Sequence, residues 1–356
     1  MATGERVDRR TPDRRATVRR PGRRSLLVGA SVLALIAAVL APAIAGASAP
    51  KAGGGKGQKI DFTADPPEGF EARDPNAPAP EPGTVHQITM HATETVLEIA
   101  PGVKQEMWTF DKTVPGPILR GKVGDTFEIT LVNDGKIGHS IDFHASKVAW
   151  NVEMRTIEPG EELLYTFVAK KAGIFMYHCG TAPTLHHIGN GMYGAILIDP
   201  PDLAPVAHEY VMVQSELYTA PLGGVASLDK MLANKWDAVV FNGYPNQYKF
   251  QPIRVEPNEQ IRIWVIDDGP SENSSFHVVG SIFDKVWKEG AYLLQPGVGG
   301  SQAMDLQPAQ GGYVELSFDA AGLYPFVTHK FSSASIGALG LFQAGEVEMP
   351  AGGASH

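Results

Sequence analysis

The chain has 356 residues, of which 43% are hydrophobic, and this length and apolar content are sufficient for about two packed domains. Its 39 glycines and 27 prolines favour a turn-rich all-β protein over a helical one, and its single cysteine excludes an intrachain disulfide framework. The first 24 residues hold nine arginines and three acidic residues, whereas the whole chain has a net charge of −9. The remainder is therefore strongly acidic, which argues against a nucleic-acid partner.

Residues 1–50 have the features of an export signal. Arg23-Arg24 precede a largely apolar run at 26–44, and small residues follow at 45–49. The paired arginines are typical of a twin-arginine signal, and the small residues suit a signal peptidase. The apolar run is also near the length of a membrane anchor, so cleavage and anchoring both stay open. In either case we expect the folded part to be exported, to the periplasm, the cell surface or the medium.

The next segment, 51–83, is rich in glycine and lysine and then in proline, alanine and acidic residues. Such a composition buries too little apolar surface to fold alone, so it predicts a flexible linker. Residues 349–356 are predicted to be a tail.

From Thr84 onward the sequence consists of short β-like runs separated by turn residues. The run 126–131 alternates polar and apolar residues strictly, as a half-buried strand does. The motif at 172–178 recurs weakly at 321–329, and a Gly-Ala-aliphatic run follows each copy. We therefore predict two tandem β-sandwich domains, at 84–200 and 205–348. Within the second, Asp267-Asp268-Gly269 is typical of a turn.

A metal-binding pattern lies between Tyr177 and Met192. The only cysteine, Cys179, follows His178 directly, and His187 and Met192 come eight and thirteen positions after it. A lone cysteine is more often a small buried side chain. Thiolate, imidazole and thioether on one loop, however, are the ligand types of a blue-copper centre, which also needs a second histidine.

Two further histidines extend this pattern in the same predicted domain. His139 and His144 are five residues apart, so on an extended strand they would point to opposite faces and could serve two different metals. The adjacent His178 and Cys179 have the same property. One set would then hold Cys179 with His139, and the other would hold His178 with His144. His329, at the repeat position equivalent to the His178 region, is a candidate third ligand of a catalytic site with an open position.

Taken together, these motifs resemble a known family over residues 84–348. The matching segments are Val114-Pro115-Gly116-Pro117, His139 to His144 with Asp142 inside, Tyr177-His178-Cys179, the His187 to Met192 spacing, Val240-Phe241-Asn242-Gly243, Phe276-His277-Val278-Val279-Gly280 and Thr328-His329. They resemble the copper-containing nitrite reductases, which belong to the two-domain cupredoxin group within the multicopper oxidases. The resemblance implies two Greek-key cupredoxin domains and a homotrimer.

The resemblance also implies a cofactor and a reaction. One type 1 copper per chain would be bound by His139, Cys179, His187 and Met192. One type 2 copper would lie between subunits, on His144 and His178 of one and His329 of the next. Asp142 and His277 match the pair that delivers protons to nitrite, which is reduced to nitric oxide in dissimilatory denitrification as an electron passes through Cys179-His178. The electron donor would be a small cupredoxin or a c-type cytochrome.

Two positions depart from the family pattern. Val279 stands where the family usually has isoleucine over the type 2 copper, so the substrate pocket has one methylene less and the preference for nitrite stays open. His186 stands where a tryptophan commonly flanks the type 1 histidine, so His186 competes with His187 as the ligand. The five-residue gap to Met192 favours His187.

Two other functions are weighed against nitrite reduction. A laccase-like multicopper oxidase needs eight histidines in His-x-His-type pairs for its trinuclear cluster, and this chain has 11 histidines and no His-x-His. A non-catalytic cupredoxin electron carrier would give His144, His277 and His329 no role.

Overall fold

The computed structural model describes residues 56–294, 297 and 299–348, which lie in one compact unit. The predicted export segment at 1–50 and the tail at 349–356 fall outside the described residues. Within the described ranges, no helix is both long and apolar enough to cross a bilayer.

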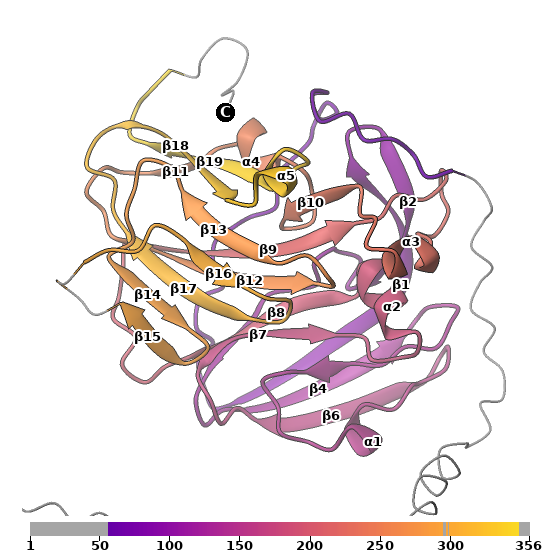
Figure 1. Cartoon of the computed structure of the whole chain (residues 1–356). Coiled ribbons are helices and arrows are strands. Elements are labelled where there is room, and N and C mark those ends of the chain that lie inside the picture. The colour runs from indigo at the N-terminus through magenta and orange to yellow at the C-terminus, as the bar shows by residue number, and fades with distance from the viewer. Residues whose placement is uncertain (1–55, 295–296, 298, 349–356) are drawn as a thin grey trace, which may run out of the picture. The chain divides into compact units, whose positions relative to one another are not determined.

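The first half of the described chain forms two four-stranded sheets (Figure 1). One sheet has the order β2-β1-β4-β6 and the other β3-β8-β7-β5. Their strands are β1 (Val85–Ala100), β2 (Val103–Phe110), β3 (Leu119–Lys122), β4 (Thr126–Asn133), β5 (Asp142–Phe143), β6 (Glu162–Val168), β7 (Gly173–His178) and β8 (Tyr193–Asp199). Strand β4 alternates between partly buried and buried residues along its whole length, as its sequence predicts, because its apolar face packs on the core between the two sheets.

The second half repeats this plan with larger sheets. A six-stranded sheet has the order β10-β9-β12-β17-β14-β15, and a five-stranded sheet has the order β11-β19-β18-β13-β16. Their strands are β9 (His208–Leu217), β10 (Ala238–Phe241), β11 (Ile253–Val255), β12 (Ile261–Gly269), β13 (Ser274–Val278), β14 (Lys285–Lys288), β15 (Ala291–Leu294), β16 (Met304–Leu306), β17 (Gly311–Leu316), β18 (Gly322–Thr328) and β19 (Leu339–Ala344). The described chain is thus an all-β protein with two tandem sandwiches.

The helices are short, as the sequence predicts. They are α1 (Trp150–Glu153), α2 (Thr184–Gly189), α3 (Leu228–Leu232), α4 (Gln247–Phe250) and α5 (Phe331–Ala334). Helix α2 carries part of the metal-binding pattern.

Strand β12 is buried at every position because both of its faces are covered. Ile263 and Val265 belong to the core of the second sandwich, whereas Trp264 and Ile266 pack against side chains of β7 and β8 such as Met176. A strand covered on both faces is a near-continuous apolar run, and the two sandwiches share this packing layer.

A network of buried charges also joins the two sandwiches. Arg120 on β3 contacts Asp199 at 3.0 Å and Glu209 at 2.7 Å. Glu209 on β9 also pairs with Arg262 on β12, and Arg262 in turn contacts Glu315 at 2.6 Å. Because each buried guanidinium faces carboxylates, its desolvation is offset, and Glu209 connects one sandwich to the other.

The described part of the predicted linker, 56–83, has no regular strand, but it is held against the body of the protein. Arg73 donates to the carbonyls of Pro115 and Gly116 at 2.6 and 2.9 Å, and Phe62 packs on an apolar cluster. The prediction of a free linker is therefore wrong for these residues. Composition alone could not show that the scattered apolar side chains of this segment pack against the folded domains.

The predicted turn at Asp267-Asp268-Gly269 is also wrong, since these residues end β12 and both acids are buried. The two carboxylate oxygens of Asp268 have no hydrogen-bond partner among the described residues. Burial, and then the neighbouring Asp267, raises the pKa of Asp268 well above its ordinary value, because a charged carboxylate is disfavoured away from water.

We therefore expect Asp268→Asn to stabilise the protein increasingly as pH rises. A folded-state pKa above the unfolded one means that the folded state releases the proton less readily, so wild-type stability falls with rising pH between the two values. The asparagine does not titrate, and the difference in free energy of unfolding should grow by at most about 1.4 kcal/mol per pH unit. Denaturant unfolding from pH 5 to 8 measures this difference, and a constant difference would contradict the assignment.

Candidate metal centres

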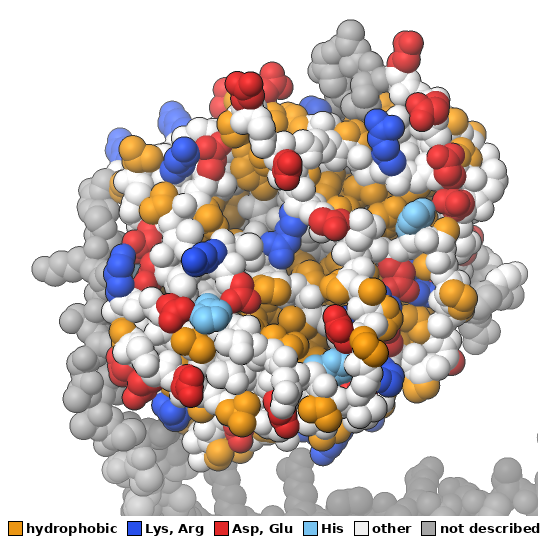
Figure 2. All heavy atoms as spheres, turned by 180° about the vertical axis from the view of Figure 1, so that it is seen from behind, with side chains coloured by type: hydrophobic (Ala, Val, Ile, Leu, Met, Phe, Trp, Pro, Cys, Tyr) orange, Lys and Arg blue, Asp and Glu red, His pale blue; other side chains and the backbone are white. Residues whose placement is uncertain are grey.

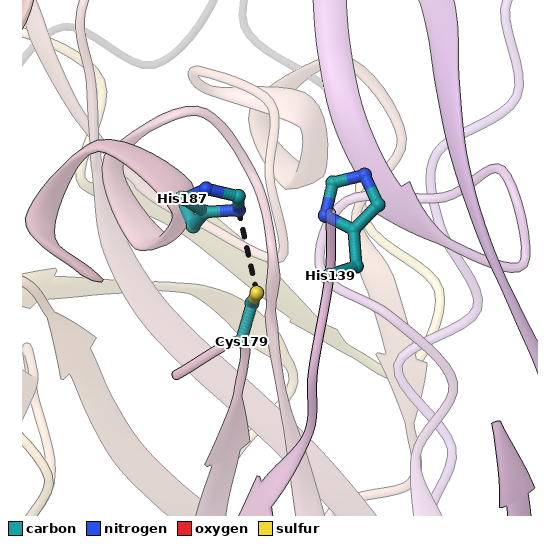
Figure 3. Close-up of side chains that lie close together, drawn as sticks. All are labelled: His139, Cys179 and His187. Atoms are coloured by element: carbon teal, nitrogen blue, oxygen red, sulfur yellow. Dashed lines mark hydrogen bonds between the residues drawn. The ribbon is translucent and has the colours of Figure 1, made fainter. Parts of the chain in front are cut away.

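Three side chains from separate segments converge in the first sandwich (Figure 3). Cys179 directly follows β7, His187 lies in α2, and His139 precedes β5, where it forms an isolated bridge with Ile157. All three are buried, and their ligand atoms lie within 4.8 Å of one another. The Cys179 Sγ and His187 Nδ1 atoms are 3.3 Å apart.

Met192 is tied to the same cluster through the main chain. Its carbonyl accepts a hydrogen bond from the Cys179 amide at 3.1 Å, and its own amide donates to the His187 carbonyl at 3.0 Å. The side chain is fully buried. The main chain of Met192 therefore lies beside the cluster.

The donor set fits a thiophilic metal ion such as copper. The Nδ1 atom of His139 is buried and has no hydrogen-bond partner among the described residues, which is costly for a polar atom unless a ligand completes it. Burial alone would raise the pKa of Cys179, but the neighbouring His139 and His187 hold it well below its ordinary value. The thiolate that metals bind is thus favoured here.

The structure also distinguishes the two adjacent histidines on α2. The His186 Nε2 lies 2.7 Å from the Ala226 carbonyl oxygen, and burial lowers the pKa of His186. Both rings pack on Trp108, with centroid distances of 4.7 and 4.6 Å. His187 belongs to the cluster and His186 does not, in agreement with the spacing to Met192.

A second group consists of Asp142, His144 and His178. Asp142 on β5 pairs in register with His178 on β7, so the two side chains lie on the same face, and Asp142 Oδ2 is 3.8 Å from His178 Nε2. The Nε2 atoms of His144 and His178 are 3.0 Å apart. His144 is exposed at the surface, but the protein around its ring still removes part of the water. This partial desolvation and then the nearby His178 lower the pKa of His144, which favours the neutral form that binds metals.

His178 is oriented by its own neighbour. Its Nδ1 lies 3.0 Å from the Cys179 carbonyl oxygen. A carbonyl only accepts, so Nδ1 carries the proton and the neutral ring turns the Nε2 lone pair toward His144. Such a carbonyl contact to the second ring nitrogen is typical of histidines that bind metals.

His277 and His329 form a separate pair in the second sandwich. Their ring centroids are 5.2 Å apart, and both rings line a cavity of about 270 Å³ together with Val279 and Phe331. His329 is exposed, and His277 is partly exposed. Within the described part of one chain, neither belongs to the His144–His178 group.

Comparison with known proteins gives the family. Residues 91–203 match the family model described as "Multicopper oxidase". The copper-containing nitrite reductase of Neisseria meningitidis is 35% identical over 276 residues, which are 74% of this chain and 70% of that protein. The chain belongs to the copper-containing nitrite reductase family.

Solved structures agree with this family. The copper nitrite reductase of Nitrosomonas europaea aligns with a TM-score of 0.67 at 35% identity and covers 73% of this chain and 94% of that one. The corresponding reductase of Thermus scotoductus aligns with a TM-score of 0.68 at 30% identity and covers 73% of this chain and 62% of that one. The predicted cupredoxin-like fold is thereby confirmed.

Sequence reasoning missed two residues beside the first cluster of this family member. Trp108 packs on both His186 and His187, and the Glu94 Oε1 lies 3.3 Å from the His139 Nε2. Burial alone would lower the pKa of His139, but Cys179 and Glu94 raise it to about 9. Neither residue has a distinctive spacing to the ligands along the chain, since both reach the cluster from neighbouring strands.

We expect His187→Ala to abolish the visible copper–thiolate absorption of copper-loaded protein, whereas His186→Ala should retain it. The His186 substitution leaves the buried Ala226 carbonyl without its partner, so it should lower the free energy of unfolding by about 1–3 kcal/mol. Absorption spectra and denaturant unfolding of both variants measure these effects. Loss of the absorption in the His186 variant alone would reverse the assignment of the two residues.

Proposed function

We propose that this protein reduces nitrite to nitric oxide with two coppers per chain. The proposal rests above all on the adjacency of His178 and Cys179, which belong to different groups of metal-binding side chains. The type 1 site would be formed by His139, Cys179, His187 and Met192. The type 2 site would be formed by His144 and His178 with His329 of a neighbouring copy.

Bound copper would supply a one-electron relay at the first site and a Lewis acid at the second. The peptide link between Cys179 and His178 joins the two sites by covalent bonds. Nitrite, one electron and two protons give nitric oxide and water, so the second site also needs groups that hold protons. Asp142 lies 3.8 Å from His178, and His277 lies beside His329. We assign both as proton donors.

The exposure of the second group supports a site completed by another copy. His144 of this group is exposed in the single chain, and so is His329. The two histidines of the group, His144 and His178, alone make an incomplete metal site. A homotrimer would bring His329 of one copy to His144 and His178 of the next. Val279, which lines the cavity beside His277 and His329, would then border the substrate.

The acidic chain would repel an anion at long range. Figure 2 shows one face of the molecule on which acidic and basic side chains are intermixed, without a continuous basic patch. We propose that the metal and the protonated groups beside it supply the local attraction for nitrite.

We further propose that residues 1–50 direct export, so that the protein acts in the periplasm, at the cell surface or outside the cell, in dissimilatory denitrification. A small cupredoxin or a c-type cytochrome would donate the electron.

We expect copper-loaded protein with an artificial reductant to produce nitric oxide from nitrite, and His329→Ala to lower this rate at least about 100-fold, since a missing ligand disrupts the Lewis acid. The blue absorption should stay unchanged because the type 1 ligands are intact. His208→Ala is the matched control, because His208 is also exposed and contacts Glu259 at 3.4 Å rather than any candidate metal ligand.

The outcomes separate the alternatives. An unchanged rate in the His329 variant would support the electron-carrier function and defeat ours. Oxygen consumption with more than two coppers per chain would support a laccase-like oxidase.

A further inference from the structure

Glu94 on β1 is a buried carboxylate next to the first metal cluster. Its side chain is only 4% exposed, and its Oε1 lies 3.3 Å from the Nε2 of His139, whose side chain is fully buried. Burial of a carboxylate is costly unless the group is paired and hydrogen-bonded. The position of Glu94 therefore calls for a compensating interaction, and His139 provides part of it.

The turn after β4 holds the carboxylate independently of His139. The Lys136 amide donates to both oxygens of Glu94, at 3.0 and 2.8 Å. A Cβ at Gly135 would come within 2.8 Å of Oε1, so glycine at this position leaves room for the carboxylate. Contacts other than the one with His139 thus also hold Glu94 in place.

This contact determines which nitrogen of His139 can present its lone pair to the cluster. An ionised carboxylate only accepts hydrogen bonds, so the proton is on Nε2. In the neutral form of the ring, which is the form that binds a metal, the Nδ1 atom is then unprotonated. It is also the buried atom without a partner among the described residues. His139 itself belongs to the group that includes Cys179 and His187.

We propose that Glu94 is a positioning residue of the blue-copper centre, which orients His139 and, as a buried negative charge, favours Cu(II) over Cu(I). The inference rests on the proposed binding of copper at Cys179. A carboxylate on the second nitrogen of a metal-binding histidine makes the ring a stronger ligand. Because Glu94 is shielded from water, salt screens its charge only weakly. The residue thereby lowers the reduction potential of the centre.

The test is Glu94→Gln, which removes the charge and keeps the shape and an oxygen that accepts from Nε2. We expect the variant to retain the blue absorption and to lose about tenfold of its affinity for Cu(II) relative to Cu(I), since outer partners of this kind change metal affinity about 10–100-fold. A tenfold loss raises the one-electron potential by about 59 mV. Redox titration of the blue absorption measures this shift.

Glu98→Gln is the matched control. Glu98 is on the same strand, about 13 Å further along at the usual rise per residue, and its carboxylate pairs with Lys104 at 3.6 Å. The substitution removes the same charge without contact to His139, so the potential should stay at the wild-type value.

Each outcome has one meaning. A wild-type potential in the Glu94 variant overturns the inference, and so does an equal rise in both variants, since that is a general effect of charge. If Glu94→Gln fails to fold, Glu94→Asp, which keeps the charge, should fold and hold copper; failure of both would assign Glu94 to folding alone and overturn the inference. Absence of the blue absorption in wild-type copper-loaded protein would instead defeat the proposed function.

Discussion

Both groups of candidate metal-binding side chains depend on how strand β7 ends. Successive residues of a strand point to opposite faces, so the consecutive His178 and Cys179 direct an imidazole and a thiolate to two different groups. Strand β7 is paired on both sides, with β5 and with β8. This pairing fixes its register, and a shift by one residue would exchange the faces on which these side chains lie. The two groups of side chains are therefore joined by one peptide link.

The sequence was sufficient for the features that follow from this periodicity. His139 and His144 have opposite parity, and the structure places them in different groups. The spacing to Met192 favoured His187 over His186, and His187 Nδ1 lies 3.3 Å from Cys179 Sγ. The strict alternation at 126–131 likewise predicted a half-buried strand, because one face of β4 packs on a core.

The features that the sequence could not predict depend on contacts between distant segments. Glu94 approaches His139 from another strand, and nothing in its local sequence separates it from Glu98. The segment Asp267-Asp268-Gly269 has a composition typical of a turn, yet it lies at the end of a strand covered on both faces. Arg73 is in a segment whose composition is typical of a linker, but it donates hydrogen bonds to the carbonyls of Pro115 and Gly116. In each case the partner decides the role, and local propensity contains no information about the partner.

The two groups differ in burial in a way that suits the two proposed roles. His139, Cys179 and His187 are all at most 3% exposed, so little water has to rearrange when the charge of a metal there changes. His144, by contrast, is exposed and His178 partly exposed, which leaves access for a small anion. A substrate site has to admit its ligand, whereas an electron relay needs no access for one. The single strand end at His178 and Cys179 meets both requirements, because one of its faces is turned into the core and the other toward the surface.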